Sequence, residues 1–199
     1  MRSGVALAIA VFVAAPAVPA FAQPSPASAD DIAVFKAILQ NKIQPEAARH
    51  GSGPAAPLAV VDRTISLCGS NRSPDMRCFE EETLRTFLSL RVWENPNGGG
   101  DPITREIRDE LQTSFLARNA ESHPVPAGSI DGVTLTPSSR LKIGIAHASF
   151  GSPAYSRDGH ALVLASYVCG NVCGYGWMFL LERRGTEWRV VTVDMLWIS

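Results

Sequence analysis

Four cysteines are the residues of this chain whose type and spacing most directly suggest chemistry. They are Cys68, Cys78, Cys169 and Cys173. An even number of cysteines in an exported chain predicts disulfide bonds, because oxidising compartments favour paired sulfurs. Four cysteines can pair in three ways, and we favour the pairing of sequence neighbours, Cys68–Cys78 with Cys169–Cys173. In a hairpin with its loop at residues 170–172, the flanking cysteines would face each other at about 4.5–5.5 Å between Cα atoms, which suits a disulfide. The other bond would close a polar loop.

Two other uses of the cysteines remain open. Two pairs could form a Cys₄ zinc site, although nine and three intervening residues differ from the two-residue spacing usual in such sites. A redox pair normally has the spacing C-x-x-C at a helix N-terminus, which lowers the thiol pKa. Here the sequence CGNVC lies in a predicted hairpin. We therefore predict structural disulfides, no metal ligands and no cofactor.

The histidines and the common catalytic motifs do not indicate an enzyme. His50, His123, His147 and His160 form no H-x-x-x-H or H-E-x-x-H pattern. The sequence also contains no G-x-S-x-G nucleophile elbow, no G-x-x-x-x-G-K-[ST] phosphate loop and no G-x-G-x-x-G fingerprint. We predict no catalytic residue. If the protein were an enzyme, His147 and Asp109 would be the candidates for a general base.

The first 22 residues, Met1–Ala22, have the three parts of a secretory signal. Arg2 supplies a positive charge, Val5–Ala15 is apolar, and Ala20-Phe21-Ala22 places small residues where a signal peptidase acts. The apolar run is shorter than the roughly 20 residues that a membrane span needs, and two prolines follow it. We therefore expect cleavage after Ala22, a periplasmic or secreted protein, and no stable membrane span once the signal is removed.

Composition places the rest of the chain among ordinary globular proteins. The 199 residues carry 18 Lys and Arg against 19 Asp and Glu, for a net charge of −1, and 46% are hydrophobic. A nucleic-acid binder would normally show a clustered basic excess, so we exclude that class of partner. Residues 23–29 are polar and proline-rich and predict a flexible leader. Residues 30–199 suit a single domain with its own core.

Three helices are predicted in the first part of the chain. Asp30–Ile43 places apolar residues at spacings of three and four, with Ser28 or Asp30 as the N-cap. Glu80–Arg91 begins with acids that suit a helix N-terminus. A third helix starts with Asp101 as N-cap and Pro102 in the first turn and runs to about Ala120. Its apolar stripe is Ile103, Ile107, Leu111 and Phe115. Proline and glycine interrupt regular secondary structure, and their presence predicts a connector over residues 44–56 and a loop over residues 95–100.

From residue 130 onward the pattern changes to that of strands. Alternation predicts strands around Val133–Leu135 and Leu141–Ile145, and Leu58–Val61 could form an earlier one. Further strands are expected over residues 149–155, 160–168, 177–183 and 188–198, with turns at Asp158-Gly159, at residues 170–172 and at residues 184–186. Helices followed by consecutive strands predict an α+β fold, in which N-terminal helices pack on one face of a C-terminal antiparallel meander.

The last 39 residues also carry a resemblance. Ala161–Ser199 contains an apolar strand, a CG-x-x-CG-x-G turn, a Leu-Glu strand end and a closing W-x-V followed by W-x-S. This stretch resembles the C-terminal meander of a group of uncharacterised exported bacterial proteins, which implies export and disulfides but no activity. The element order is similar to the cone-shaped fold of nuclear transport factor 2 and the ketosteroid isomerase relatives. That similarity implies an apolar cavity between the helix over residues 103–120 and the sheet, with Trp177, Phe179, Trp188 and Trp197 as aromatic surface. The alternative for these aromatics is core packing.

Two functional hypotheses follow. The first is an exported, disulfide-stabilised, non-catalytic module that binds a small apolar ligand, a cell-envelope component or another protein. The second is a small cavity enzyme of the cone-fold type, a general acid/base isomerase or hydrolase. A pocket lined by a buried carboxylate or a histidine would favour the enzyme, and a closed apolar core would exclude it.

Overall fold

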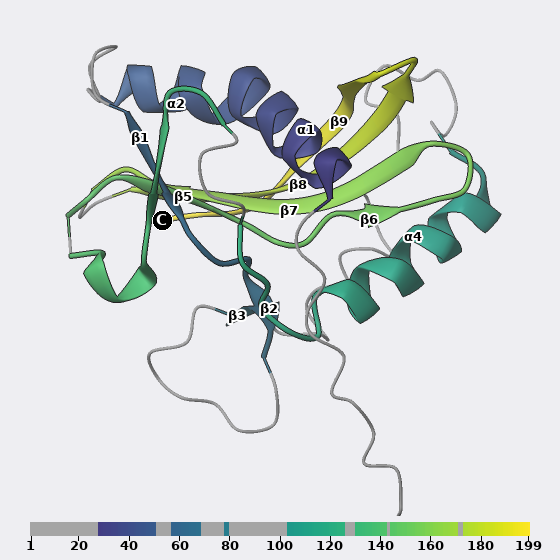
Figure 1. Ribbon diagram of the computed structural model, residues 1–199, viewed down its shortest axis with the longest axis horizontal. Coiled ribbons are helices and arrows are strands. Elements are labelled where there is room, and N and C mark those ends of the chain that lie inside the picture. The colour runs from purple at the N-terminus through teal and green to yellow at the C-terminus, as the bar shows by residue number, and fades with distance from the viewer. Residues whose placement is uncertain are drawn as a thin grey trace, which may run out of the picture.

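The computed structural model describes residues 28–50, 57–68, 78–79, 103–125, 130–142, 144–170 and 173–199 (Figure 1). The predicted signal peptide, nearly all of the predicted leader, the predicted helix Glu80–Arg91 and the predicted loop over residues 95–100 lie outside these residues. The chain has an α+β fold, as the sequence predicts.

A seven-stranded mixed sheet forms the centre of the described structure, with the order β4-β1-β5-β7-β8-β9 and with β6 beside β7. The strands of this sheet are β1 (Leu58–Val61), β4 (Val133–Thr136), β5 (His147–Phe150), β6 (Ala154–Tyr155), β7 (His160–Val168), β8 (Gly174–Arg184) and β9 (Glu187–Ile198). The C-terminal strands β7, β8 and β9 pair antiparallel as consecutive hairpins, which confirms the predicted meander. The strand β1, however, lies parallel to both β4 and β5, so the sheet is not purely antiparallel. A separate two-stranded sheet joins β2 (Ser66–Leu67) to β3 (Cys78–Phe79).

Two of the predicted strands differ from the structure. The alternation over Leu141–Ile145 does not form a strand in its described residues: a 3₁₀ turn, Ser138–Arg140, precedes it, and Gly144 has a φ of 92°. The predicted strand over residues 149–155 is divided into β5 and β6, which pair with successive parts of β7. The break lies at Gly151, Ser152 and Pro153. There the side chain of Asn119, and not a neighbouring strand, bonds to the N–H and the carbonyl of Ser152.

The first helical segment runs further than the sequence predicts. It comprises α1 (Ala29–Ile38), a π-helical turn (Leu39–Ile43) and α2 (Gln44–Arg49). Residues 44–49 are thus helical rather than a connector. A proline inside a helix removes an N–H and its ring collides with a carbonyl four residues earlier. Here Pro45 lies in the first turn of α2, directly after the widened turn, where these costs are small. Ser28 is the N-cap of α1, one of the two predicted candidates.

The helix α4 (Arg105–Arg118) confirms the predicted apolar stripe but not its ends. Leu111 and Phe115 are fully buried and Ile103 is nearly so. The N-cap is Thr104, whose Oγ1 accepts a hydrogen bond from Ile107 N at 3.4 Å. The predicted cap Asp101 and the predicted first-turn Pro102 lie outside the described residues. The helix ends at Arg118 because Asn119 leaves helical geometry and uses its side chain to bind other segments.

Helices cover both faces of the sheet, not one (Figure 1). On one face, α1 and the π-turn pack Phe35, Ile38 and Ile43 against odd-numbered residues of β7 and β8. On the other face, α4 packs against the even-numbered residues, among them Leu164 and Met178. Each face therefore has its own apolar core.

The predicted aromatic surface is mostly core. Trp177, Phe179 and Trp188 are buried on the α1 face, so they do not line a cavity beneath α4. The α4 face is filled by Leu111, Phe115 and the even-numbered strand residues instead. The core-packing alternative is thus confirmed for these three aromatics.

Trp197 has a different role, because it lies on two glycines of the neighbouring strand. It pairs with Gly176 across the β8–β9 hairpin. A Cβ built on Gly176 would overlap the indole at Nε1, Cε2 and Cδ1, and a Cβ on Gly174 would meet the same ring at 2.9 Å. Glycine is therefore required here by the close approach of the indole and not by a special backbone conformation.

Within the part of the chain that the structure describes, every helix is too short or too polar to cross a membrane.

We predict that Gly176→Ala lowers the free energy of unfolding by about 1–3 kcal/mol, because the added methyl group overpacks the contact with Trp197. Urea denaturation of the purified protein would measure the loss. In a Trp197→Ala background the same substitution should cost much less. Equal costs in the two backgrounds would show that the indole does not set the requirement for glycine.

Candidate functional site

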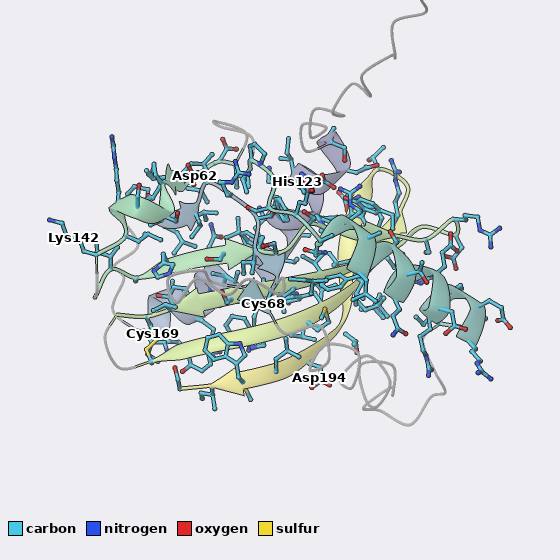
Figure 2. All side chains as sticks on the ribbon, turned by 90° about the horizontal axis from the view of Figure 1, so that it is seen from below. Asp62, Cys68, His123, Lys142, Cys169 and Asp194 are labelled. Atoms are coloured by element: carbon cyan, nitrogen blue, oxygen red, sulfur yellow. A yellow bond between two sulfur atoms is a disulfide. The ribbon has the colours of Figure 1, made fainter. Side chains whose placement is uncertain are left out.

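A pocket of about 230 Å³ lies where α1, the C-terminal end of α4 and three loops meet. The loops are the segment after β1, the segment after α4 and the break between β5 and β6. The sequence predicts no site at this position. Its lining residues are Asp31, Phe35, Thr64, Arg118, His123, Pro124, Ser152 and Pro153. Figure 2 shows His123 beside the helices and far from the hairpin end of the sheet that carries Cys169. Phenylalanine and the two prolines supply apolar surface, and the other lining residues are polar.

The carboxylate of Asp31 is the most constrained group in the pocket. The residue is only 3% exposed. Its Oδ2 accepts a hydrogen bond from Ser28 N at 3.0 Å, which completes the capping box of α1. Arg118 Nη2 donates to both carboxylate oxygens, at 3.2 and 3.1 Å, and Tyr155 Oη donates to Oδ1 at 2.7 Å. Each oxygen therefore accepts two hydrogen bonds, so all four lone-pair positions of the carboxylate are used.

Tyr155 is held by the same carboxylate. Its burial raises the pKa of the phenol, and its hydrogen bond to Asp31 raises that pKa further, because both favour the neutral hydroxyl over the phenolate. The Arg118 guanidinium lies over the Tyr155 ring, with Cζ 5.4 Å from the ring centroid. Tyr155 is thus a fixed hydrogen-bond donor at neutral pH.

Asn119 and Thr64 fasten the loops that frame the pocket. The Asn119 side chain accepts from Ser152 N at 2.7 Å and donates to Ser152 O at 2.9 Å, so it binds the break between β5 and β6 to the end of α4. Thr64 Oγ1 accepts from His123 N and from Ser152 Oγ, at 2.8 and 3.2 Å. These bonds join segments that are far apart in sequence, and they place His123, Ser152 and Thr64 around one space.

Two polar atoms of lining residues have no protein partner. Arg118 Nε and His123 Nδ1 are both buried, and neither has a hydrogen-bond partner in the part of the chain that the structure describes. A buried polar group without a partner typically costs about 1–3 kcal/mol. Both atoms belong to residues that line the pocket, and a polar atom of a ligand could satisfy them.

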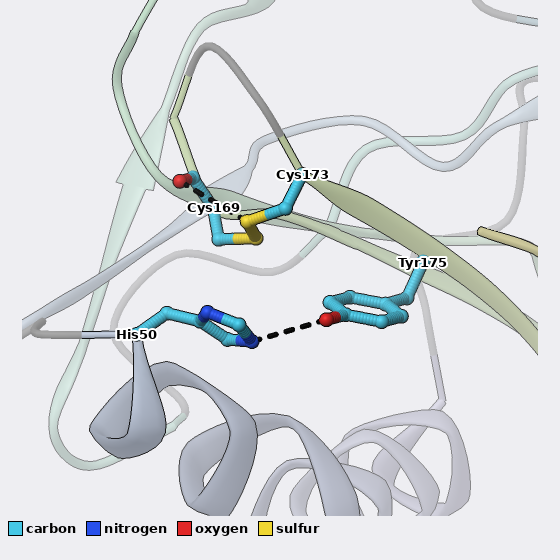
Figure 3. Close-up of a disulfide and its surroundings, with 4 residues drawn as sticks. All are labelled: His50, Cys169, Cys173 and Tyr175. Carbon is cyan, nitrogen blue, oxygen red and sulfur yellow. Dashed lines mark hydrogen bonds between the residues drawn. A yellow bond between two sulfur atoms is a disulfide. The ribbon is translucent and has the colours of Figure 1, made fainter. Parts of the chain in front are cut away.

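Cys169 and Cys173 lie apart from this pocket. Cys169 and Cys173 are paired at disulfide distance, with 5.3 Å between their Cα atoms, which confirms the predicted hairpin bond. His50 and Tyr175 lie beside that bond (Figure 3). Cys68 is also disulfide-bonded. The side chain of Cys78 lies outside the described residues, so its pairing with Cys68 stays a prediction.

The two candidate bases lie outside the pocket lining. His147 is buried in β5, with its Nδ1 2.8 Å from Ile145 O, and Asp109 is exposed on α4. Sequence reasoning missed Asp31, Arg118 and Tyr155. Asp31 carries one local signal, because it stands three residues after a serine N-cap. Its contacts with Arg118 and Tyr155 span 87 and 124 residues and have no local signal.

We predict that Arg118→Met lowers the free energy of unfolding by about 1–3 kcal/mol, because the buried carboxylate of Asp31 loses two of its four hydrogen bonds. The matched control is Arg157→Met. Arg157 pairs with Glu110, but its side chain is 89% exposed, so its loss should change stability by no more than about 0.5 kcal/mol. Chemical denaturation measures both, and equal losses would contradict a special role for the Asp31 pair.

We also predict that the stability difference between the wild type and Tyr155→Phe narrows above pH 10. The raised pKa means that folded Tyr155 keeps its proton while the unfolded tyrosine loses it near pH 10. The contribution of the neutral hydroxyl is therefore complete below pH 10 and is lost as the pH rises further, by at most about 1.4 kcal/mol per pH unit for one proton. Denaturation of both proteins at about pH 8, 9, 10 and 11, around the pH at which tyrosine titrates, would measure this difference. If folding did not raise the pKa of Tyr155, the difference in free energy of unfolding would stay the same at every pH.

Comparisons of the chain with protein-family models, with curated proteins and with solved structures found no match. The resemblance of Ala161–Ser199 to exported bacterial proteins therefore stays a prediction. The pocket is small and half-polar. It contains a fully hydrogen-bonded carboxylate, two polar atoms that have no partner among the described residues, and three apolar lining residues.

Proposed function

We propose that the protein is an exported, non-catalytic binding module whose pocket takes a small, mainly apolar ligand with one neutral hydrogen-bond acceptor. The observation that carries this proposal is a pair of buried atoms without partners among the described residues, Arg118 Nε and His123 Nδ1. They belong to a pocket whose apolar lining is Phe35, Pro124 and Pro153. Arg118 Nε–H is a donor, and His123 Nδ1 is a donor in the tautomer that carries its proton there, so in that state a carbonyl or hydroxyl oxygen would accept from both nitrogens. The apolar part of the ligand would contact the phenyl ring and the prolines.

The charges around the pocket favour a neutral ligand over an acid. The guanidinium of Arg118 is already neutralised by Asp31, at 3.1 Å. A ligand carboxylate would bring a second negative charge close to that buried carboxylate, and like charges repel strongly where water is excluded. A ketone, amide or alcohol oxygen satisfies the donors without this repulsion.

The size of the pocket limits the ligand. A volume of about 230 Å³ lies below the roughly 300–1,000 Å³ of pockets that hold drug-sized molecules. The ligand class is therefore a compact one, such as a single ring or a short branched chain with one oxygen substituent.

The pocket is lined by a buried carboxylate and a histidine, the feature that would favour the enzyme hypothesis, but the hydrogen bonds of that carboxylate argue against a catalytic role. A general base needs a lone pair directed at the proton that it removes, and all four lone-pair positions of Asp31 accept hydrogen bonds. His123 is the remaining titratable candidate, but no protein hydrogen bond orients its ring among the described residues, whereas catalytic histidines are normally oriented by a partner. The cone-fold similarity, which suggested an isomerase or hydrolase, stays a prediction. It required a cavity beneath α4, where the structure has packed apolar residues.

Export and disulfides complete the proposal. The signal-like segment Met1–Ala22 supports a periplasmic or secreted location, and the Cys169–Cys173 bond suits an oxidising compartment. A cell-envelope or protein partner remains an alternative occupant for the module as a whole. The pocket favours a small molecule, because it is recessed and framed by fixed polar groups.

We predict that cyclohexanone binds more tightly than cyclohexanecarboxylate, because the ketone satisfies the two donors without repelling Asp31. At a concentration about tenfold above its dissociation constant, a bound ligand should raise the free energy of unfolding by about 1.4 kcal/mol. Thermal unfolding in the presence of each probe would measure this increase, and isothermal titration calorimetry would give the affinities.

Two variants test whether the ketone binds in this pocket. His123→Phe removes one donor and should weaken ketone binding by roughly tenfold, the effect of about 1.4 kcal/mol. Arg157→Met lies outside the pocket lining and should bind as the wild type does. Tighter binding of the carboxylate, or equal ketone binding by the His123 variant, would overturn the proposed ligand class.

A further inference from the structure

A second group of chemically active side chains lies at the hairpin end of the sheet. His50, Cys169 and Cys173 each offer one ligand atom, and these three atoms lie within 4.8 Å of one another (Figure 3). The cysteines flank the turn between β7 and β8, and His50 follows the last residue of α2. The group is therefore assembled by packing of the first helical segment against the meander.

We propose that reduction of the Cys169–Cys173 disulfide converts this group into a binding site for Zn²⁺. Thiolate sulfur and imidazole nitrogen are the preferred zinc ligands, and zinc sites commonly place two cysteines with two to four residues between them. Here three residues intervene, which lies within that range although it is one more than the most usual spacing. The two sulfurs and one nitrogen make three protein ligands, so the fourth tetrahedral position is open to water or to an exogenous ligand.

Tyr175 fixes the histidine. Its Oη lies 3.1 Å from His50 Nε2. A metal-bound imidazole usually donates its other ring N–H to a neighbouring oxygen, which orients the ring. With Nε2–H donating to Tyr175, Nδ1 is the nitrogen that coordinates the metal. Tyr175 is itself held by stacking on Trp177, with ring centroids 5.4 Å apart and an angle of 9° between the planes.

The conversion is a balanced exchange with a dithiol reductant. The dithiol transfers two electrons and two protons to the Cys169–Cys173 bond, so the S–S bond breaks, two thiols form and the reductant becomes a cyclic disulfide. Zn²⁺ then binds both sulfurs as thiolates and displaces their two protons to solvent. The oxidised hairpin has no thiolate to offer, so metal binding depends on the redox state of these two cysteines.

The test uses Co²⁺ as a spectroscopic substitute for Zn²⁺ in the chain carrying Cys68→Ser and Cys78→Ser, which leaves two cysteines. After reduction and anaerobic removal of the reductant, we expect one Co²⁺ per chain, with the visible bands of tetrahedral cobalt and a thiolate charge-transfer band. Added Zn²⁺ should abolish these bands by displacement. The oxidised chain should show neither band.

Variants separate this site from adventitious binding. His50→Ala should weaken Co²⁺ binding by at least about tenfold, and Tyr175→Phe should weaken it by roughly 10–100-fold, the usual effect of losing a group that orients a ligand. His160→Ala removes a histidine outside the cluster and should bind as the parent does. Equal binding by the His50 variant, or no tetrahedral bands in the reduced parent, would overturn the proposal.

A second measurement covers the case in which the two serine substitutions prevent folding. The four-cysteine chain is then reduced and compared with Cys169→Ser/Cys173→Ser, and its metal content is measured by a colorimetric zinc assay. A loss of one Zn²⁺ per chain in the variant supports the site, and an unchanged stoichiometry overturns it.

Discussion

The buried carboxylate of Asp31 is the constraint on which the described structure most depends. Removal of a charge from water is expensive unless hydrogen bonds satisfy it, and here the donors come from the start of α1, the end of α4 and the strand β6. Since α1 and α4 lie on opposite faces of the sheet, this one group links both apolar cores. The pocket lies at the junction, which is why a polar site exists between two apolar layers.

Local sequence patterns predict the elements that depend on residues close together in the chain, such as helix faces, helix caps and tight turns. The stripe of α4, the Ser28 cap and the hairpin that brings Cys169 to Cys173 follow from side-chain periodicity and turn chemistry. The same reasoning fails where distant segments decide the outcome. The alternation of Leu141–Ile145 suits a strand, yet the partner of β1 on that side of the sheet is β5, which begins only at His147. The alternation of apolar and polar residues indicates which side chains face the core, but it does not indicate which strands pair with each other.

The pocket shows the same limit at the level of single bonds. The sequence predicts one strand over residues 149–155, although strands disfavour Gly151 and Pro153. The strand is broken because Asn119 takes the backbone N–H and carbonyl of Ser152, and a side chain at Gly151 would meet Asn119 Oδ1 at 2.9 Å. Asn119 is separated from Ser152 by 33 residues. Gly151 and Pro153 are local signals for the break. No short window of sequence contains both Asn119 and Ser152, so the pocket that the break frames could not be predicted from local patterns.

The helical segment over residues 29–49 positions both the pocket and the group formed by His50, Cys169 and Cys173. Asp31 lies in the first turn of α1 and His50 caps the end of α2, with the π-turn between them. The buried side chains of this segment, including Phe35, Ile38 and Ile43, pack on the same sheet face that carries Trp177 and Tyr175. Packing fixes the helix as a rigid body, because interiors are too dense to allow independent sliding of its two ends. The donors of the pocket and the ligands at the hairpin therefore depend on one apolar interface, although their chemistries differ.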